Sequence, residues 1–281
     1  MSQRVVTSVT GRSPGDHVCW PFHGIEEDVE AARAYVAEGL GCRERVAFLK
    51  VTSQSLGYAT VSDVAEVGRP EGVRRPVRTE LTAPSAQTGA SSALLSSSAL
   101  LQVDRMTRGA VEDGFTGLRL FTDVDDLVRD PDGRRHWIRS EHLIDRYALD
   151  NPLIVLCGYD VDDLGDRAVA EAARVHALTR GALSPFRLRA DARAGLALVG
   201  DVDVASADAL YDALLTIGPE LRARTTVSVA ELRFIDHAGL LALDRAARSL
   251  DVSVTLVDAE PLTCWLAATL GLRNVVTRAV S

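Results

Sequence analysis

Lysine is almost absent from this 281-residue chain: Lys50 is the only one, and every other basic residue is arginine. Outside Lys50 there is therefore no candidate for a catalytic Schiff base. The chain also lacks the sequence GxxxxGK[ST], the phosphate-binding loop of many ATPases, and the residues that follow Lys50 put no lysine at the required place. We therefore expect no ATP hydrolysis.

Long apolar runs and paired cysteines are absent as well. No stretch of about 18 apolar residues occurs, which excludes a membrane-spanning helix. The N-terminal segment lacks the apolar core of a signal peptide. The four cysteines are scattered, without a CxxC pair, so no dense disulfide framework is indicated. These absences together predict a protein of the reducing cytoplasm.

The composition that remains is that of a globular protein. Hydrophobic residues make up 47% and charged residues 25%, which is sufficient for the cores of two domains of ordinary size. The net charge is −8, with both signs mixed along the chain, whereas a nucleic-acid-binding surface needs a basic face. We expect no nucleic-acid partner.

Alternating helical and strand patterns divide the chain into two α/β domains. We expect a flexible arm over residues 1–14, a first domain over 15–180, a linker over 181–185 and a second domain over 186–281. A helix that leads directly into a short buried strand is typical of the α/β class. The chain is long enough for each domain to have its own core.

In the first domain, a helical pattern from Glu26 to Leu40 precedes a buried strand over Arg45–Val51. A second buried strand covers Leu153–Cys157, after a helix from about Arg135 to Leu149. Between them, residues 82–99 are rich in Ser, Ala and Thr and nearly uncharged, so we expect a mobile lid or a poorly ordered loop there.

The second domain has its own pattern of strands and helices. Ser206 is expected to cap its first helix, which runs to about Leu215, and Pro261 opens its last helix, which Gly271 ends. Strands are expected at 186–189, 196–199, 226–229 and 254–257. The middle helix is expected at about 238–250 and the last helix at 261–270.

Three motifs of the second domain, in this order, carry a family resemblance. Gly200–Asp203 ends a strand, Phe234–Leu240 reads Phe-Ile-Asp-His-Ala-Gly-Leu between a strand and a helix, and Gly271-Leu272 follows the last helix. They resemble the STAS family, which includes bacterial anti-sigma factor antagonists and the cytoplasmic tails of sulfate transporters. The resemblance implies a mixed sheet with helices and, as partner, an anti-sigma factor with a kinase-like ATP-binding fold. The partner contacts that it implies are Asp201, Asp203, Asp236, His237, Ala238, Gly239 and Leu240.

The position after Asp236 departs from that family. Its antagonists carry a serine there, and phosphorylation by the partner kinase adds nearly two negative charges and breaks the complex. Here the position is His237, so the resemblance implies binding without the phosphoserine switch. Sensing of pH or of a ligand by the imidazole, phosphorylation of the histidine and loss of the partner are the alternatives. We expect Asp236 to cap the following helix and Gly239 to permit a tight turn.

The first domain resembles a different family over about residues 15–180. His17-Val18-Cys19 opens the match, Gly114–Arg119 reads Gly-Phe-Thr-Gly-Leu-Arg, and Leu156–Asp160 reads Leu-Cys-Gly-Tyr-Asp. These motifs resemble the MEDS sensory domain of methanogen and methylotroph regulators, including dichloromethane-pathway repressors. The resemblance implies a RecA-like three-layer α/β fold without Walker motifs.

The MEDS resemblance fails between Gly57 and Leu101, where the Ser/Ala-rich stretch replaces the usual aromatic segment. A ligand pocket built from that segment is therefore not expected in its usual form. Candidate ligand contacts elsewhere in the domain are His17, Cys19, Cys157 and His176.

Imidazole and thiolate ligands suit zinc or copper, and His23 follows His17 and Cys19 closely. The spacing is not a diagnostic zinc signature, however, so no metal and no cofactor is assigned. Loop histidines and small core cysteines are the alternative. Cys157 with His176 is the one candidate nucleophilic pair, and no third group is evident to orient it.

The sequence therefore predicts a regulatory protein rather than an enzyme, with a sensory domain that controls a STAS domain. Two alternatives come from other classes of protein. One is a scaffold or homo-oligomeric STAS protein, and the other is a small-molecule-binding protein or enzyme that uses the first domain.

Overall fold

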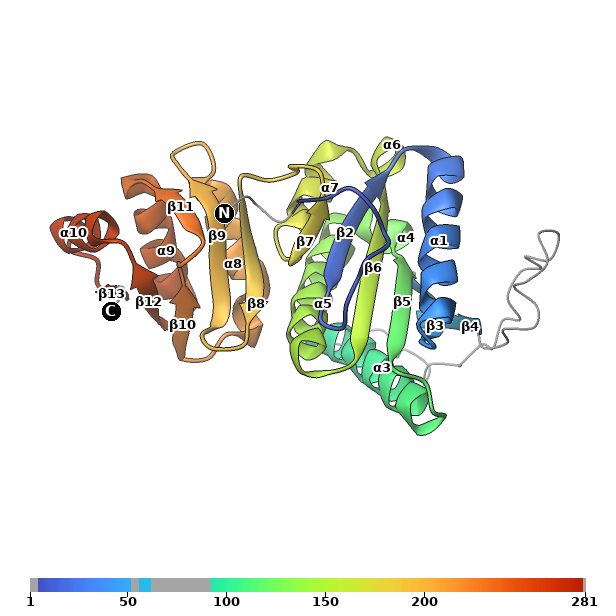
Figure 1. Ribbon diagram of the computed structural model, residues 1–281. Helices are drawn as coiled ribbons and strands as arrows, with labels where there is room; N and C mark the ends of the chain where they lie inside the picture. The colour runs from blue at the N-terminus through green and yellow to red at the C-terminus, as the bar shows by residue number, and fades with distance from the viewer. Residues whose placement is uncertain (1–4, 52–55, 62–91, 280–281) are drawn as a thin grey trace.

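The computed structural model describes residues 5–51, 56–61 and 92–279, which form two α/β units side by side (Figure 1). The mixed α/β class predicted for the chain is confirmed. Expectations for residues 62–91, which include part of the Ser/Ala-rich stretch, lie outside the described residues. No helix in the described ranges is both long and apolar enough to cross a membrane.

The first unit is built on a seven-stranded sheet with the order β1-β7-β2-β6-β5-β3-β4. Neighbouring strands are parallel, except that β4 runs antiparallel to β3. The strands are β1 (Val5–Val6), β2 (His17–Phe22), β3 (Arg45–Val51), β4 (Leu56–Val61), β5 (Leu118–Asp123), β6 (Leu153–Asp160) and β7 (Leu178–Arg180). The helices are α1 (Gly24–Gly41), α3 (Ser92–Glu112), α4 (Asp125–Val128), α5 (Pro131–Asp150), α6 (Val161–Leu164) and α7 (Asp166–Ala173).

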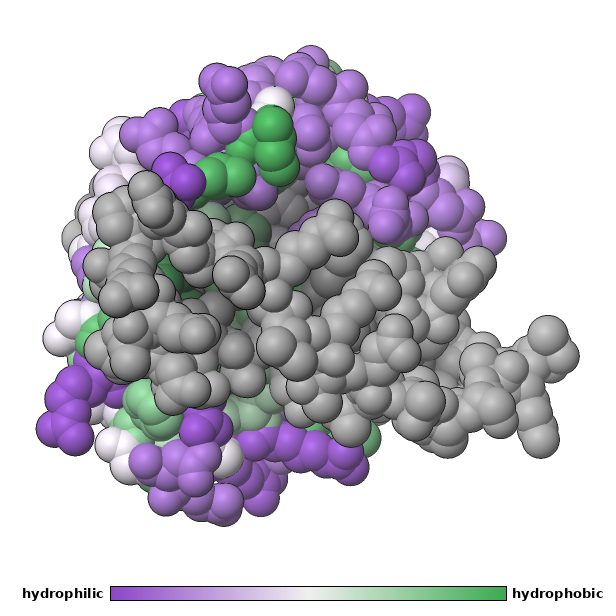
Figure 2. Space-filling view, turned by 90° about the vertical axis from the view of Figure 1, so that its right-hand side faces the viewer, coloured by the Kyte–Doolittle hydropathy of each residue, from purple (hydrophilic) through white to green (hydrophobic). Residues whose placement is uncertain are grey.

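Helices cover both faces of this sheet, which gives the three-layer arrangement that the family resemblance of the first domain implies. In β6, Ile154 and Leu156 belong to the core under α1, while Val155, Cys157 and Tyr159 belong to the core under α3, α5 and α7. The alternation follows from the two-residue period of a strand. On the side that carries α1, the described surface visible in Figure 2 is mostly hydrophilic, with small apolar groups.

Helix α5 is placed by a strong start signal and a wide buried stripe. The Asp130 side chain caps it by accepting a hydrogen bond from Gly133 N at 2.7 Å, and Pro131 occupies the first turn. Trp137, Ile144 and Ala148 are buried on the face toward the sheet. Polar side chains on this buried face are therefore held close to the strands.

The second unit contains a six-stranded sheet, with helices α8, α9 and α10 packed against its core. Strand β9 pairs antiparallel with β8 on one side, and on the other side it pairs in turn with β10 and β11. Strand β12 lies between β10 and β13, parallel to both. The elements are β8 (Phe186–Asp191), β9 (Gly195–Val202), α8 (Ala207–Ile217), the 3-10 helix η1 (Gly218–Glu220), β10 (Arg224–Ser228), β11 (Leu232–Ile235), α9 (His237–Ser249), β12 (Ser253–Ala259), α10 (Pro261–Leu270) and β13 (Val275–Ala279).

The two units share a continuous interface along β8. Ile138 of α5 and Val175 belong to the same core cluster as Phe186 of β8. The N–H of Leu188 donates to the carbonyl oxygen of Arg174 at 2.6 Å, so the outer edge of β8 is paired by the first unit. A covered edge strand has lost the free N–H and C=O groups that would pair with another chain.

Two segments that the sequence predicts to lack regular structure are structured in the described residues. Residues 5–14 are not a free arm, because Val5 and Val6 pair with β7 and Val9 is buried. Residues 92–99 are not a loop, because α3 begins at Ser92. Ala99, Val103, Met106 and Ala110 of α3 are buried in the core beside the sheet. The high Ser and Ala content of residues 82–99 gives little hydropathy contrast, so the helical periodicity was not recognised there.

Candidate functional site

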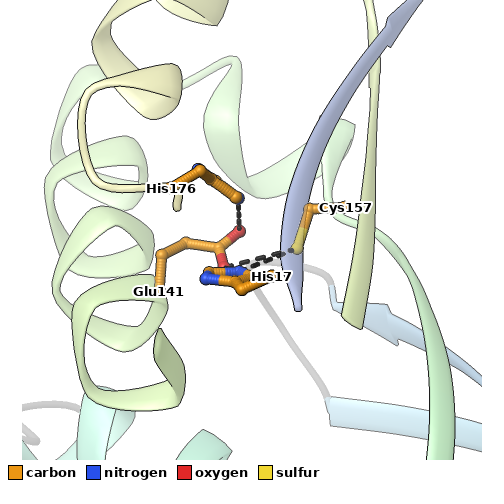
Figure 3. Close-up of side chains that lie close together, drawn as sticks. All are labelled: His17, Glu141, Cys157 and His176. Carbon is orange, nitrogen blue, oxygen red and sulfur yellow. Dashed lines mark hydrogen bonds and ion pairs between the residues drawn. The ribbon is translucent and has the colours of Figure 1, made fainter. Parts of the chain in front are cut away.

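Four polar side chains meet in the interior of the first unit, between the sheet and α5 (Figure 3). His17 comes from β2, Cys157 from β6, Glu141 from α5 and His176 from the segment after α7. All four side chains are fully buried. We call this group the buried quartet.

The four residues approach each other within hydrogen-bonding or ion-pair distance. Glu141 Oε2 lies 2.7 Å from His17 Nε2, and Cys157 Sγ donates to the same oxygen at 3.3 Å. Cys157 Sγ is also 3.4 Å from His17 Nε2. The second oxygen of Glu141, Oε1, lies 3.6 Å from His176 Nε2. Glu141 is therefore the common neighbour of the other three residues.

Outer groups orient the members of the quartet. Asp145 Oδ1 lies 3.2 Å from His17 Nδ1, and the carbonyl oxygen of Ala172 lies 2.9 Å from His176 Nδ1. Tyr159 donates its hydroxyl proton to Glu141 Oε1 at 2.6 Å, and Trp137 donates to that hydroxyl at 3.1 Å. Each ring nitrogen Nδ1 thus has an acceptor, which turns both Nε2 atoms toward Glu141.

The pKa values of the quartet are displaced by burial and by mutual attraction. Burial alone favours neutral His17, but the neighbouring Cys157 and Glu141 and the hydrogen bond to Asp145 outweigh it and raise its pKa well above the usual value. Burial also opposes ionisation of Glu141, yet His176 and His17 hold the pKa of that carboxyl well below its usual range. Burial and the charge of Glu141 raise the pKa of Cys157 to about 12.

These shifts describe an ion pair beside a neutral thiol. The raised pKa of His17 and the lowered pKa of Glu141 favour an ion pair between the two, and the raised pKa of Cys157 favours its neutral thiol. Because the thiol is uncharged, the Glu141 carboxylate is the negative charge in the quartet that holds the imidazolium. A buried, protonated thiol is a poor nucleophile, so the geometry gives no support to Cys157 as a catalytic residue.

The structure brings together three of the four predicted ligand residues. Cys19 is next to Cys157 in the register of β2 and β6 and is buried, but it lies outside the quartet. Burial raises the pKa of the Cys19 thiol well above its usual value, and the nearby Glu141 carboxylate raises it further. His23, close to His17 in sequence, is exposed at the end of β2 and bonds Asp162 instead.

Glu141, Asp145 and Tyr159 were missed by sequence reasoning. The available signal was the position of Glu141, four residues after Trp137 on the buried stripe of α5. A charged carboxylate at a buried position is rare unless it has a partner. A charged residue at an apolar position of a helix indicates a buried partner.

The junction before α9 in the second unit is the other candidate site. Asp236 Oδ1 accepts a hydrogen bond from Gly239 N at 3.0 Å, so the expected helix cap is formed. His237 is the first helical residue and its side chain is exposed. Ala238 is partly exposed beside it.

Two predicted partner contacts at this junction must be corrected. Leu240 is completely buried in the core of the second unit, and Gly239 is buried beneath the helix start. Gly239 does not serve a tight turn, because it lies inside α9 with φ outside the left-handed region. It is required because a Cβ would lie 2.7 Å from Val202 Cγ1 and 2.8 Å from Ile235 Cγ1.

Asp201 and Asp203 lie near the same end of β9. Asp201 pairs with exposed Arg233. Asp203 accepts hydrogen bonds from Ser206 N at 3.0 Å and Ser206 Oγ at 2.9 Å, which lowers the pKa of its carboxyl. Ser206 does occupy the N-cap position of α8, but its hydroxyl bonds Asp203 rather than the first turn.

An open groove of about 270 Å³ lies beside the α9 junction. Two of its apolar lining side chains are exposed, Phe234 by 53% and Leu262 by 70%, and Trp265, three residues after Leu262 on α10, is 63% exposed. The groove is lined by Arg233, Phe234, Ile235, Asp236, His237, Glu260, Leu262, Thr263 and Leu266. We call Phe234, Leu262 and Trp265 the apolar patch.

Comparison with known proteins matches the first unit. The model of the MEDS family, the methanogen/methylotroph DcmR sensory domain, covers residues 16–177, which is more than half of the chain. No curated protein matches the chain significantly. The matched range contains His17, Glu141, Cys157 and His176 and ends immediately before β7. The chain therefore belongs to the MEDS family, and its first unit is a sensory domain.

Proposed function

We propose that this protein is a cytoplasmic, non-enzymatic regulator that binds a kinase-type anti-sigma factor through its second unit. In this proposal the second unit is a STAS domain, and the sensory domain controls its binding. The observation that carries the proposal is the exposed start of α9 next to the apolar patch. The partner contacts are His237 and Ala238 at the helix start, together with Asp236, Asp201 and Asp203.

The apolar patch has the composition of a protein-binding surface. Aromatic side chains dominate the binding energy of many interfaces. Here Phe234 lines the groove and Trp265 is exposed on α10, the helix that contributes Leu262 to the same groove. Charged side chains of Arg233 and Glu260 border the groove. An apolar centre with a polar rim is the usual anatomy of such a surface.

The exposure of His237 supports an antagonist that has no phosphoserine switch. The side chain after the capping aspartate is accessible, so a serine at this position would be accessible to a kinase. An imidazole offers no hydroxyl to phosphorylate. The complex is then expected to persist in the presence of ATP, because no added phosphate charge repels the partner.

A physical route connects the sensory domain with the second unit. Asp145, whose Oδ1 lies 3.2 Å from His17, accepts a hydrogen bond from Ala190 N of β8 at 2.5 Å with its other oxygen. Strand β8 pairs along its length with β9, and the end of β9 contacts the α9 junction, where Asp236 N donates to Val202 O at 3.1 Å. A change at the quartet therefore has a short path of hydrogen bonds toward the partner surface.

Co-purification followed by reconstitution tests this function. The intact chain, tagged, is purified from its native cells beside the double variant Phe234→Ala/Trp265→Ala, and captured proteins are identified by mass spectrometry. The expected result is an ATP-binding anti-sigma factor captured by the intact chain and not by the variant, with binding reproduced by the purified pair. If only copies of this chain are recovered and light scattering finds a large assembly, the protein is a scaffold instead.

A further inference from the structure

We propose that the buried quartet is a metal site, in which His17, Glu141, Cys157 and His176 bind one Zn²⁺ ion. The proposal does not depend on the identity of the partner protein. It rests on the type, spacing and orientation of four side chains from separate elements of the first unit.

The four ligand atoms are already gathered at nearly the required spacing. They all lie within 4.8 Å of one another. Tetrahedral zinc with bonds of about 2.0–2.3 Å needs its ligand atoms about 3.3–3.8 Å apart. Cys157 Sγ lies 3.4 Å from His17 Nε2 and 3.3 Å from Glu141 Oε2. His176 Nε2 lies 3.6 Å from the other oxygen of that carboxylate, Oε1, so the carboxylate stands between His176 and the other two residues.

The pair formed by His17 Nε2 and Glu141 Oε2 is too close for a common ion, at 2.7 Å. Separating these atoms to the tetrahedral spacing requires a shift of less than about 1 Å. The Glu141 side chain can supply it, because its carboxylate can rotate about the terminal side-chain torsion, which is soft. The site therefore needs a small adjustment rather than a rearrangement of the fold.

The orientation of His176 is the strongest sign of a ligand. Its Nδ1 lies 2.9 Å from the Ala172 carbonyl oxygen, which can only accept, so Nδ1 carries a proton. Its Nε2 points into the quartet and is fully buried, and it makes no hydrogen bond there, since Glu141 Oε1 lies 3.6 Å away, at ion-pair distance. A buried nitrogen left without a hydrogen bond is costly, and coordination of a metal ion would satisfy it.

His17 has the same arrangement, with Asp145 in place of the carbonyl group. A carboxylate or carbonyl on the outer nitrogen is the usual support of a metal-binding histidine, because it fixes both the tautomer and the ring orientation. Glu141 is held in turn by the Tyr159 hydroxyl at 2.6 Å. Three of the four residues therefore have the outer contacts that metal ligands need.

The donor set selects the metal. Two imidazoles, one thiolate and one carboxylate suit zinc, whereas Ca²⁺ and Mg²⁺ prefer oxygen ligands in larger number. Binding displaces the protons of the Cys157 thiol and of His17 Nε2 to solvent, and the charges of the thiolate and of the Glu141 carboxylate then balance those of Zn²⁺. Four protein ligands without solvent exposure leave no open position, so the ion has a structural or regulatory role rather than a catalytic one.

Metal analysis of the intact chain tests the proposal. The protein is purified from zinc-supplemented cells without a metal-affinity tag, and its metal content is measured by mass spectrometry. The chelated protein is then titrated with Co²⁺, followed by visible absorption. We expect about one zinc per chain and, with Co²⁺, tetrahedral bands together with a sulfur-to-metal charge-transfer band.

Cys157→Ser is compared with Cys19→Ser, which removes an equally buried cysteine from the adjacent strand. Loss of the charge-transfer band in the first variant alone supports the site, and circular dichroism reports whether each variant is folded. If the wild-type chain contains no stoichiometric zinc and bound Co²⁺ keeps the spectrum of the hydrated ion, the proposal is wrong. That wild-type measurement decides the matter even if Cys157→Ser does not fold.

Discussion

Asp145 of the sensory domain accepts a hydrogen bond from the backbone N–H of Ala190 in the second unit, at 2.5 Å. Its other carboxylate oxygen lies 3.2 Å from His17 Nδ1. A single buried carboxylate therefore links the quartet with the first strand of the second unit. This is a direct connection between the quartet and the fold that carries the proposed partner surface.

Substitution of Asp145 by asparagine should weaken this connection. Hydrogen bonds to buried charged groups contribute about 1.5–3 kcal/mol, so we expect Asp145→Asn to lower the free energy of unfolding by about 2 kcal/mol. Hydrogen exchange of the Ala190 amide should accelerate. Asp150→Asn, an exposed position at the end of the same helix, is the control and should change neither quantity. An unchanged exchange rate at Ala190 would refute the link.

Binding of the proposed partner should depend on the apolar patch. Trp265→Ala removes an aromatic side chain that is 63% exposed, so it should weaken partner binding by at least about tenfold and leave the melting temperature nearly unchanged. Ile25→Ala, which removes a side chain that is 70% exposed on α1, should not alter the affinity. Calorimetric titration measures the partner affinity of both variants. Equal effects of the two substitutions would exclude the apolar patch as the partner-binding surface.

Gly239 and Gly109 provide a matched test of close packing. Both lie inside helices, where alanine is favoured over glycine by up to about 1 kcal/mol. A Cβ at Gly239 would lie 2.7 Å from Val202, whereas at Gly109 the nearest atom would be 3.7 Å away. We expect Gly239→Ala to destabilise by about 1–3 kcal/mol and Gly109→Ala to stabilise slightly. Chemical denaturation measures the free energy of unfolding of both variants. Stabilisation by Gly239→Ala would contradict the close contact of Gly239 with Val202 and Ile235.

Asp28 on α1 should make stability depend on pH. Burial and the charges of Asp123 and Asp160 raise the pKa of Asp28 from 3.8 to about 6. Because the folded state holds this proton more tightly than the unfolded state, its stabilising contribution is complete below pH 3.8 and is lost as the pH rises through about 6.

Asp28→Asn removes this loss, so it should raise the melting temperature more at pH 8 than at pH 5. Glu30→Gln, an exposed position on the same helix, removes the same charge without the burial and serves as the control. Thermal unfolding at the two pH values measures the difference. Equal changes of the melting temperature at pH 5 and pH 8 on Asp28→Asn would show that the pKa of Asp28 is not raised in the folded state.

Much of the fold could be predicted from local patterns. The strand predicted at Leu153–Cys157 and the helix predicted from about Arg135 to Leu149 correspond to β6 and α5, because hydrophobic periodicity acts over a few residues. The start of α5 at Pro131, capped by Asp130, was not predicted. The helical state of residues 92–99 could not be recognised, because Ser and Ala give little hydropathy contrast. This state is decided by packing on the sheet, which a local pattern does not contain.

The site shows the same division between local and long-range information. His17, Cys157 and His176 stood out because histidine and cysteine are rare in the chain and carry distinctive chemistry. Glu141 is one of many acidic residues, and its role depends on which face of α5 meets the sheet. The approach of Asp145 to Ala190 depends on the packing of two units, for which neither sequence segment contains a signal.

The most direct test of the proposed function is titration of the purified anti-sigma factor into the intact chain with and without ATP. His237→Ser is titrated in parallel. We predict that the wild-type complex has the same affinity in both conditions and that ATP releases the partner only from the serine variant. Loss of the wild-type complex on addition of ATP, or absence of binding by both proteins, would contradict an antagonist that has no phosphoserine switch.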